Sequence, residues 1–206
     1  MNCGETLQLP VRRLGKAPEG TKLAVVNEGI AGNRFLSDGF MVNVRCFGVS
    51  ALARFDRDVL EVPGVTHIVL LEGVNDIGFP GAKIGGEALA DPADTRTAED
   101  LIGAYGRLIS RAHARGVKLI GATITPFEGV IIPGYYSESK EATRQAVNKW
   151  IRTSGSFDGM IDFDAVLPDP DHLSRLLPKF ASKDHLHPND AGYQAMADAI
   201  DLAVFK

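Results

Sequence analysis

The sequence predicts an α/β fold with a parallel sheet, because two patterns alternate along the chain. Short apolar runs of four to six residues lack polar alternation, which is typical of strands covered on both faces. Between these runs lie longer stretches in which apolar residues recur with the period of an α-helix. Strands that alternate with helices are joined by crossover connections and therefore run parallel.

Four segments are predicted as strands of this sheet. Each is short and apolar, and the first two are rich in β-branched residues. The segments are Leu23–Val26, Thr66–Leu71, Val117–Ala122 and Met160–Phe163.

Four stretches are predicted as helices, each placed between or after these strands. Ser50 is expected to cap the first, and Asn189 is expected to cap the last. The second carries a continuous apolar face with helical spacing. The predicted ranges are Leu52–Leu60, Ala98–Arg115, Ser137–Arg152 and Asp190–Val204.

Length and composition are those of one well-buried domain covering residues 1–206, because 45% of the residues are hydrophobic and 23% are charged. The formal net charge is −4 and no basic cluster stands out, so a nucleic-acid partner is not expected. No apolar run approaches the ~18 residues of a membrane span. The first twenty residues have no apolar signal-peptide core, so we expect a cytoplasmic location by default. Cys3 and Cys46 do not make a disulfide framework.

Three long loops follow predicted strands, at residues 79–97, 125–136 and 165–183. In open parallel sheets, ligands bind outside the carboxyl ends of the strands. These loops are therefore expected to form the walls of a substrate site. The second loop carries Phe127, Ile131, Ile132, Tyr135 and Tyr136, which either contact an acyl or aromatic part of a substrate or pack the core.

The most informative stretch is Lys183–Tyr193, in which Asp184 lies three residues before His187. These two side chains can hydrogen-bond within one short loop. The carboxylate would fix the imidazole tautomer and stabilise the imidazolium form. This pair is the base half of a hydrolytic triad, with His187 as general base and Asp184 orienting it.

Two further strand ends offer donors for an oxyanion. Gly32 follows the first predicted strand and can turn its backbone N–H toward a ligand. Asn75 follows the second predicted strand and offers a side-chain NH2. Together they could stabilise the charge that forms when an ester carbonyl is attacked.

These blocks resemble the SGNH, or GDSL, hydrolase superfamily from about Leu23 to the end of the chain. Gly32 is similar to the block II glycine, Asn75 in Gly73–Asp76 to the block III asparagine, and Asp184 with His187 to the block V D-x-x-H motif. The resemblance implies a flavodoxin-like three-layer α/β/α sandwich. It also implies hydrolysis of esters, often of acyl or acetyl groups on lipids or sugars, without a cofactor.

The sequence departs from this family at block I, the G-D-S motif that ends the first strand and supplies the serine nucleophile. The nearest match is Gly4-Glu5-Thr6, and Thr6 follows too few residues for a strand to hold it. Ser37, Ser50 and Ser182 are alternative nucleophiles, but none lies at a predicted strand-to-helix turn. His185 and His187 could imitate a metal site, yet no third ligand stands at a recognised spacing.

The missing block predicts a structural gap, because the first strand of a flavodoxin-like sheet is central. Three remedies are open. Residues Asn2–Val11 could fill the lane, the Leu23–Asn27 strand could move over to pair with Thr66–Leu71, or a second chain could donate a strand. The last remedy makes a homodimer possible.

Two functions follow from the sequence. The first is a carboxylic ester hydrolase that acts on a small-molecule ester through Asp184 and His187. The second is a catalytically impaired, hydrolase-like domain that binds a ligand or a partner without chemistry, which the absent block I motivates.

Overall fold

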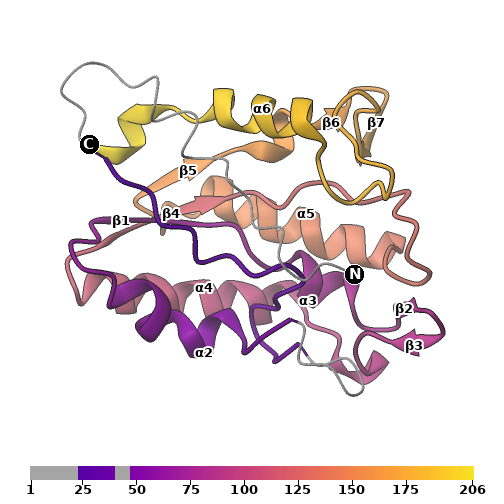
Figure 1. Cartoon of the computed structure of the whole chain (residues 1–206), viewed down its shortest axis with the longest axis horizontal. Coiled ribbons are helices and arrows are strands. Elements are labelled where there is room, and N and C mark those ends of the chain that lie inside the picture. Colours follow the sequence, from indigo (N-terminus) through magenta and orange to yellow (C-terminus); the bar gives the residue numbers. More distant parts are fainter. Residues whose placement is uncertain (1–22, 40–46) are drawn as a thin grey trace.

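The computed structural model describes residues 23–39 and 47–206. Within them, three parallel strands form a sheet in the order β1-β4-β5 (Figure 1). The strands are β1 (His67–Leu70), β4 (Lys118–Ala122) and β5 (Gly159–Ile161). The register pairs Ile68 with Leu119 and Gly121 with Met160. The α/β prediction and three of the four predicted strands are confirmed.

The remaining prediction, a strand at Leu23–Val26, is wrong, because this segment forms no strand. Leu23 is 36% exposed and Val26 is 59% exposed, so the apolar run does not enter a sheet. A strand is stable only when a neighbour satisfies its backbone hydrogen bonds, and the described chain provides no such neighbour for this segment. The proposed shift of Leu23–Asn27 onto β1 is therefore also wrong.

Helices occupy the predicted stretches. The first is α2 (Ala51–Phe55), which continues as one π-helical segment, η1 (Asp56–Leu60). The others are α4 (Ala98–His113), α5 (Glu138–Thr153) and α6 (Asp190–Ala199). The helix predicted at Asp190–Val204 is too long, because α6 ends at Ala199 and the separate 3₁₀ segment η4 (Leu202–Phe205) follows. The short helix α3 (Val74–Gly78) was not among the predicted helices. Ser50 and Asn189 accept hydrogen bonds from Ala53 N and Gly192 N, so both predicted caps are confirmed.

Helices cover both faces of the sheet, as a three-layer arrangement requires (Figure 1). On one face, Ile68, Leu70 and Leu119 pack in a core with residues of α2, α4 and α5. On the other face, Ile120 and Ile161 pack in a second core with residues of α6. In β4 the alternation of side chains places Leu119 in the first core and Ile120 in the second.

The long loops contain short elements that the sequence patterns do not predict. Residues 79–97 hold the hairpin β2 (Lys83–Ile84) and β3 (Glu87–Ala88), then η2 (Pro92–Asp94). The segment after β5 contains η3 (Phe163–Ala165), and the third loop contains the hairpin β6 (Pro168–Asp169) and β7 (His172–Leu176). No helix in the described ranges is long and apolar enough to cross a membrane.

A cavity of about 630 Å³ lies along the outer edge of β1. Residues 23–29 form the opposite wall, so the cavity separates this extended segment from the sheet. Among the described residues no strand lies on this side of β1, where a flavodoxin-like sheet has its first strand. The remedy that involves Asn2–Val11 lies outside the described residues.

Candidate active site

Asp184 and His187 lie together in the turn before α6. The Nδ1 atom of His187 is 2.7 Å from Oδ2 of Asp184, and the imidazole is 61% exposed. His185 between them has φ of +56°, a left-handed conformation that tightens the turn. With Nδ1 held by the carboxylate, Nε2 is the nitrogen that can accept a proton from a reacting group.

Asp184 is held as a carboxylate by several donors. Burial opposes its ionisation, but the backbone N–H groups of His187 and Leu186, the His187 ring and the Ser182 hydroxyl outweigh this and hold its pKa well below the usual range. The Ser182 Oγ donates to Oδ1 at 2.5 Å. Ser182 therefore supports the carboxylate rather than facing the imidazole.

Asn75 and the Gly32 loop are joined directly. Asn75, in the first turn of α3, donates from Nδ2 to the carbonyl oxygen of Asn33 at 2.8 Å. Gly32 has φ of +73°, and a Cβ atom there would lie 2.1 Å from the Phe47 ring. Only glycine combines this conformation with this close approach. The two predicted oxyanion donors thus belong to one small cluster at the carboxyl ends of the strands.

Asp76 fixes the position of this cluster. Its fully buried carboxyl group accepts the backbone N–H of Phe35 at 2.6 Å and of Leu36 at 2.8 Å. Burial raises the pKa of Asp76, while these two bonds act in the opposite direction. The loop after Gly32 is therefore bound to α3 through two backbone groups.

The loop at residues 125–136 connects the two halves of the site. Ile131 N donates to the Asp184 carbonyl at 3.1 Å, and the Tyr135 hydroxyl donates to Asn75 Oδ1 at 2.8 Å. The Tyr135 ring lies so close to Gly78 of α3 that a Cβ there would be 2.2 Å from it. Phe127 and Tyr135 are fully buried, whereas Ile131 is 65% exposed. The sequence left open whether the side chains of this loop contact a substrate or pack the core. Phe127 and Tyr135 pack the core.

Lys140 anchors the same loop from α5. Its Nζ donates to the carbonyl oxygens of Gly78, Pro80, Gly134 and Tyr135 at distances of 2.6–3.2 Å. Burial lowers the pKa of Lys140 to about 8. One ammonium group thus joins the end of α3 to the segment that carries Tyr135.

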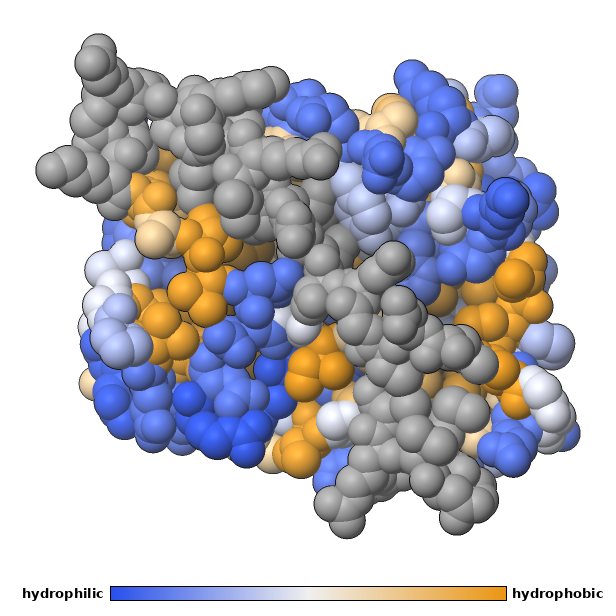
Figure 2. Space-filling view, in the orientation of Figure 1, coloured by the Kyte–Doolittle hydropathy of each residue, from blue (hydrophilic) through white to orange (hydrophobic). Residues whose placement is uncertain are grey.

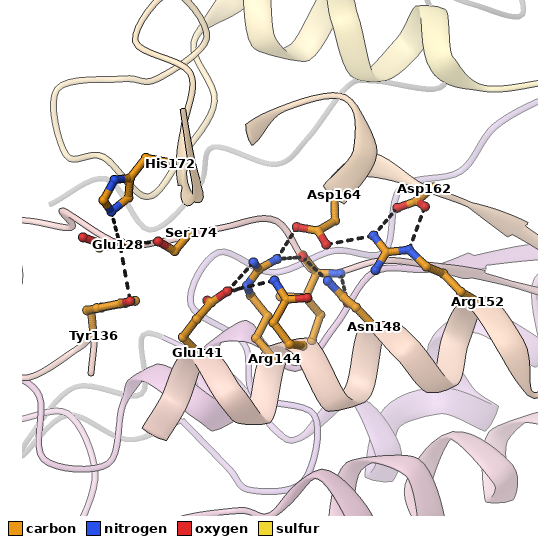
Figure 3. A network of polar contacts seen from close by, with 12 residues as sticks. Glu128, Tyr136, Glu141, Arg144, Asn148, Arg152, Asp162, Asp164, His172 and Ser174 are labelled. Carbon is orange, nitrogen blue, oxygen red and sulfur yellow. Dashed lines mark hydrogen bonds and ion pairs between the residues drawn. The ribbon is translucent and has the colours of Figure 1, made fainter. Parts of the chain in front are cut away.

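A buried ionic network supports the ends of β4 and β5 (Figure 3). The guanidinium of Arg144, on α5, is fully buried and pairs with Glu141 and Asp164. It also donates to the Ile124 carbonyl just after β4, at 2.8 Å. Arg152 joins Asp164 to Asp162, which follows β5. Sequence patterns did not reveal this network, because the arginines of α5 meet Asp162 and Asp164 only once β5 has paired with β4.

Glu128 ties the 125–136 loop to the β6–β7 hairpin (Figure 3). Its carboxylate accepts hydrogen bonds from Ser174, from Arg175 and from Tyr136. The Nε2 atom of His172 lies 3.2 Å away. Two of the three predicted loop walls are therefore linked through one carboxylate.

None of the described serine or threonine hydroxyl groups is placed to serve as the nucleophile of the site. Ser50 caps α2, and Ser37 Oγ accepts a hydrogen bond from Arg96 at 2.8 Å. The His187 ring has Asp184 as its partner, and no described serine or threonine hydroxyl is bonded to it. Thr6 lies outside the described residues. Across residues 23–39 and 47–206, no group of three metal-ligating side chains gathers at one point.

The sequence profile of the GDSL-like lipase/acylhydrolase family matches residues 6–195. Among curated proteins nothing matches.

Solved structures share the fold. The acetylxylan esterase Axe2 from Geobacillus stearothermophilus has a TM-score of 0.60 and 19% identity, covering 92% of this chain and 75% of that one. LAE5, an α/β hydrolase enzyme from the metagenome of Lake Arreo, Spain, has a TM-score of 0.63 and 19% identity, covering 96% and 79%. A GDSL-like lipase from Bacteroides thetaiotaomicron VPI-5482 has a TM-score of 0.55 and 19% identity, covering 75% and 68%.

Proposed function

Since the chain belongs to the GDSL-like lipase/acylhydrolase family, we propose that it hydrolyses carboxylic esters at the site around Asp184 and His187. The observation that carries the proposal is the 2.7 Å contact between the Asp184 carboxylate and the exposed His187 imidazole. The cluster of Gly32 and Asn75, linked to Asp184 through the 125–136 loop, supports it. The fold is shared with an acetylxylan esterase, so short acyl esters are the first substrates to try.

In the proposed reaction, His187 Nε2 takes the proton of the attacking oxygen while Asp184 stabilises the resulting imidazolium. The Gly32 N–H and the Asn75 Nδ2 donate to the oxyanion of the tetrahedral intermediate. The carbon–oxygen bond of the ester then breaks, and the imidazolium returns its proton to the leaving alcohol. The low pKa of Asp184 keeps its carboxylate ionised throughout.

The attacking oxygen comes either from water or from a hydroxyl outside the described residues, such as that of Thr6. Water activated by His187 alone gives slow turnover, because a single displacement lacks the covalent intermediate that divides one difficult step into two. We therefore expect slow hydrolysis of short-chain aryl esters by the chain alone.

The test compares the chain with His187→Ala on p-nitrophenyl acetate. His113→Ala is a matched control, because His113 also pairs with a carboxylate, that of Asp158 at 2.8 Å, but it is the last residue of α4 and lies before β4 begins. We expect His187→Ala to remove the hydrolysis above background and His113→Ala to retain it. Equal rates for the chain and His187→Ala would refute the proposal.

The alternative is a domain that binds an ester or a partner without chemistry. The observation in its favour is that no described hydroxyl contacts His187. A fluorophosphonate probe followed by peptide mapping separates the two functions. Labelling of one defined hydroxyl, dependent on His187, would contradict the binding-only function, whereas no labelling together with no turnover would support it.

A further inference from the structure

The Asn75 side-chain amide is held in one orientation by a contact at each end. The χ2 torsion of asparagine is broad and roughly two-fold, so its oxygen and its NH2 group exchange places unless neighbours distinguish them. Nδ2 of Asn75 donates to the Asn33 carbonyl oxygen at 2.8 Å, and Oδ1 accepts from the Tyr135 hydroxyl, also at 2.8 Å. A reversed amide would bring Oδ1 against the Asn33 carbonyl oxygen, where two acceptors would face each other. The two contacts therefore fix the amide.

The Asn33 end of this arrangement is fixed by the fold. Nδ2 of the buried Asn33 side chain donates to the carbonyl oxygens of Phe47 at 2.6 Å and Val49 at 2.9 Å. Its Oδ1 accepts two hydrogen bonds from the guanidinium of Arg54, which is also buried. The Asn33 side chain thus uses both of its donors and both of its lone pairs, which fixes the backbone that presents its carbonyl to Asn75.

The Tyr135 end provides a hydroxyl that keeps its proton. The Tyr135 side chain is fully buried, whereas other hydrophobic residues reach the surface on the face shown in Figure 2. Burial raises the pKa of Tyr135, and the charges of Asp76 and Asp184 add to the rise, so the hydroxyl remains a donor. The Val74 carbonyl oxygen is a second acceptor at 3.4 Å, a weaker contact than the 2.8 Å to Asn75 Oδ1. The hydroxyl therefore acts on the Asn75 amide rather than on solvent.

The Tyr135 ring is packed tightly against α3. A Cβ atom at Gly78 would lie 2.2 Å from the ring, so any side chain there would collide with it. The rings of Phe79 and Phe127 contact it edge to face, at centroid distances of 6.0 Å and 5.7 Å. The Lys140 ammonium joins the Gly78 carbonyl to the Tyr135 carbonyl. This packing gives the ring, and therefore its hydroxyl, one position.

We propose that Tyr135 is a positioning residue for the oxyanion donor Asn75, an inference that rests on the proposed function. Because Tyr135 donates to Oδ1, one Nδ2 hydrogen serves Asn33 and the other is directed to the carbonyl oxygen of a bound ester. A hydrogen bond to the amide oxygen also polarises the amide, which strengthens its N–H groups as donors. Tyr135 neither touches the ester nor exchanges its proton during the reaction.

Loss of the Tyr135 hydroxyl leaves the Asn75 amide present but poorly oriented. Loss of a whole oxyanion donor typically lowers the rate on the order of 10²–10³-fold. Because the amide keeps its contact with Asn33, we expect Tyr135→Phe to lower kcat by a smaller factor, about 10–10²-fold. KM should change by less than about twofold, because the effect arises at the developing oxyanion and not in the bound ester.

The first experiment measures kcat and KM for p-nitrophenyl acetate. Tyr136→Phe is the matched control, because it makes the same change at the next residue, whose hydroxyl contacts Glu128 instead of Asn75 (Figure 3). We expect Tyr136→Phe to retain both constants within about twofold. Equal kcat in the chain and in Tyr135→Phe, or equal losses in the two variants, would overturn the proposal.

A double variant separates positioning from general structural damage. Tyr135→Phe is combined with Asn75→Ala, which removes the amide that Tyr135 orients. We expect Asn75→Ala alone to lower kcat more than Tyr135→Phe does, and the double variant to be no slower than Asn75→Ala. The same fold-loss from Tyr135→Phe in both backgrounds would show that Tyr135 acts independently of Asn75, contrary to the proposal.

Lys140→Met changes the support of the ring but keeps the hydroxyl, so it serves if Tyr135→Phe does not fold. Lys149→Met, at an exposed position of the same helix, is its control. We expect Lys140→Met to lower kcat in the chain but not in the Asn75→Ala background, and Lys149→Met to retain it. An equal fold-loss from Lys140→Met in both backgrounds would contradict the proposal.

Binding of an oxyanion mimic tests the same role without turnover. The probe is phenyl methylphosphonate, an anion with the tetrahedral shape of the intermediate that phenyl acetate would form. Its affinity is measured from the ¹⁵N-labelled side-chain NH2 resonances of Asn75, which are identified by their absence in Asn75→Ala. We expect the probe to shift these resonances, and Tyr135→Phe to weaken its binding at least about tenfold while Tyr136→Phe does not. No shift, or equal affinity in the chain and Tyr135→Phe, would overturn the proposal.

The two proposals fail separately. Tyr135-dependent binding of the probe without any ester hydrolysis would uphold the positioning of Asn75 and refute the hydrolase. His187-dependent hydrolysis at the same kcat in the chain and in Tyr135→Phe would uphold the hydrolase and refute the positioning role.

Discussion

Glu72 is a carboxyl group whose replacement should stabilise the protein at neutral and alkaline pH. It follows β1 and lines the cavity. Burial raises its pKa from 4.5 to about 8, the nearby Asp76 charge adds to the rise, and Arg54 opposes it. In the folded chain, Glu72 is therefore mostly protonated at neutral pH.

The magnitude follows from proton linkage. Above about pH 4.5 the unfolded chain releases the Glu72 proton while the folded chain keeps it, so ionisation favours unfolding. The stability is complete below the unfolded pKa and is lost as the pH rises toward about 8. At about 1.36 kcal/mol per pH unit, the loss between pH 5 and pH 8 is about 3–4 kcal/mol.

Glu72→Gln removes this ionisation and preserves the shape of the side chain. The assay is urea unfolding of the chain and the variant at pH 5 and pH 8, followed by circular dichroism. We expect the variant to lose about 3–4 kcal/mol less between the two pH values. Glu99→Gln, exposed on α4, makes the same chemical change away from the cavity and corrects for the general effect of lost charge. The same pH-dependent loss in the chain and in Glu72→Gln would refute the reasoning.

Three further substitutions test the site and its support. Asp184→Asn should reduce ester hydrolysis on the order of 10²–10⁴-fold, because it no longer fixes the His187 tautomer; an unchanged rate would exclude this role. Tyr135→Phe removes the donor to Asn75 Oδ1 and should cost about 1–3 kcal/mol in thermal unfolding; an unchanged melting temperature would show that this bond contributes nothing. Arg144→Met leaves buried carboxylates without their cation and should cost about 3–5 kcal/mol in urea unfolding; a loss below about 1 kcal/mol would contradict the importance of the network.

Local sequence patterns predicted the elements whose stability is mostly local. The apolar face of α4 and the caps at Ser50 and Asn189 are read from neighbouring residues, and the structure contains them. The strand predicted at Leu23–Val26 was wrong for the opposite reason. Its composition favours a strand, but a strand also needs a partner in space, which composition cannot supply.

The same difference between local and long-range contacts decides which parts of the candidate site could be predicted. Asp184 and His187 lie three residues apart, so their contact could be predicted from spacing. The supports of Asn75 could not, because Tyr135 is 60 residues away along the chain and meets it only after folding. The sequence marked Tyr135 as either a substrate contact or a core residue. Only its complete burial decided between the two.

The contacts of Lys140 should make this position accept lysine but not arginine, although the two side chains carry the same charge. Its ammonium carries three protons and serves four carbonyl oxygens from different directions, so the hydrogen-bonding shell is roughly spherical. Arginine would bring a flat, larger group whose donors point within one plane. A lysine-to-arginine exchange, usually regarded as conservative, would therefore leave some of these four carbonyl oxygens without their donor.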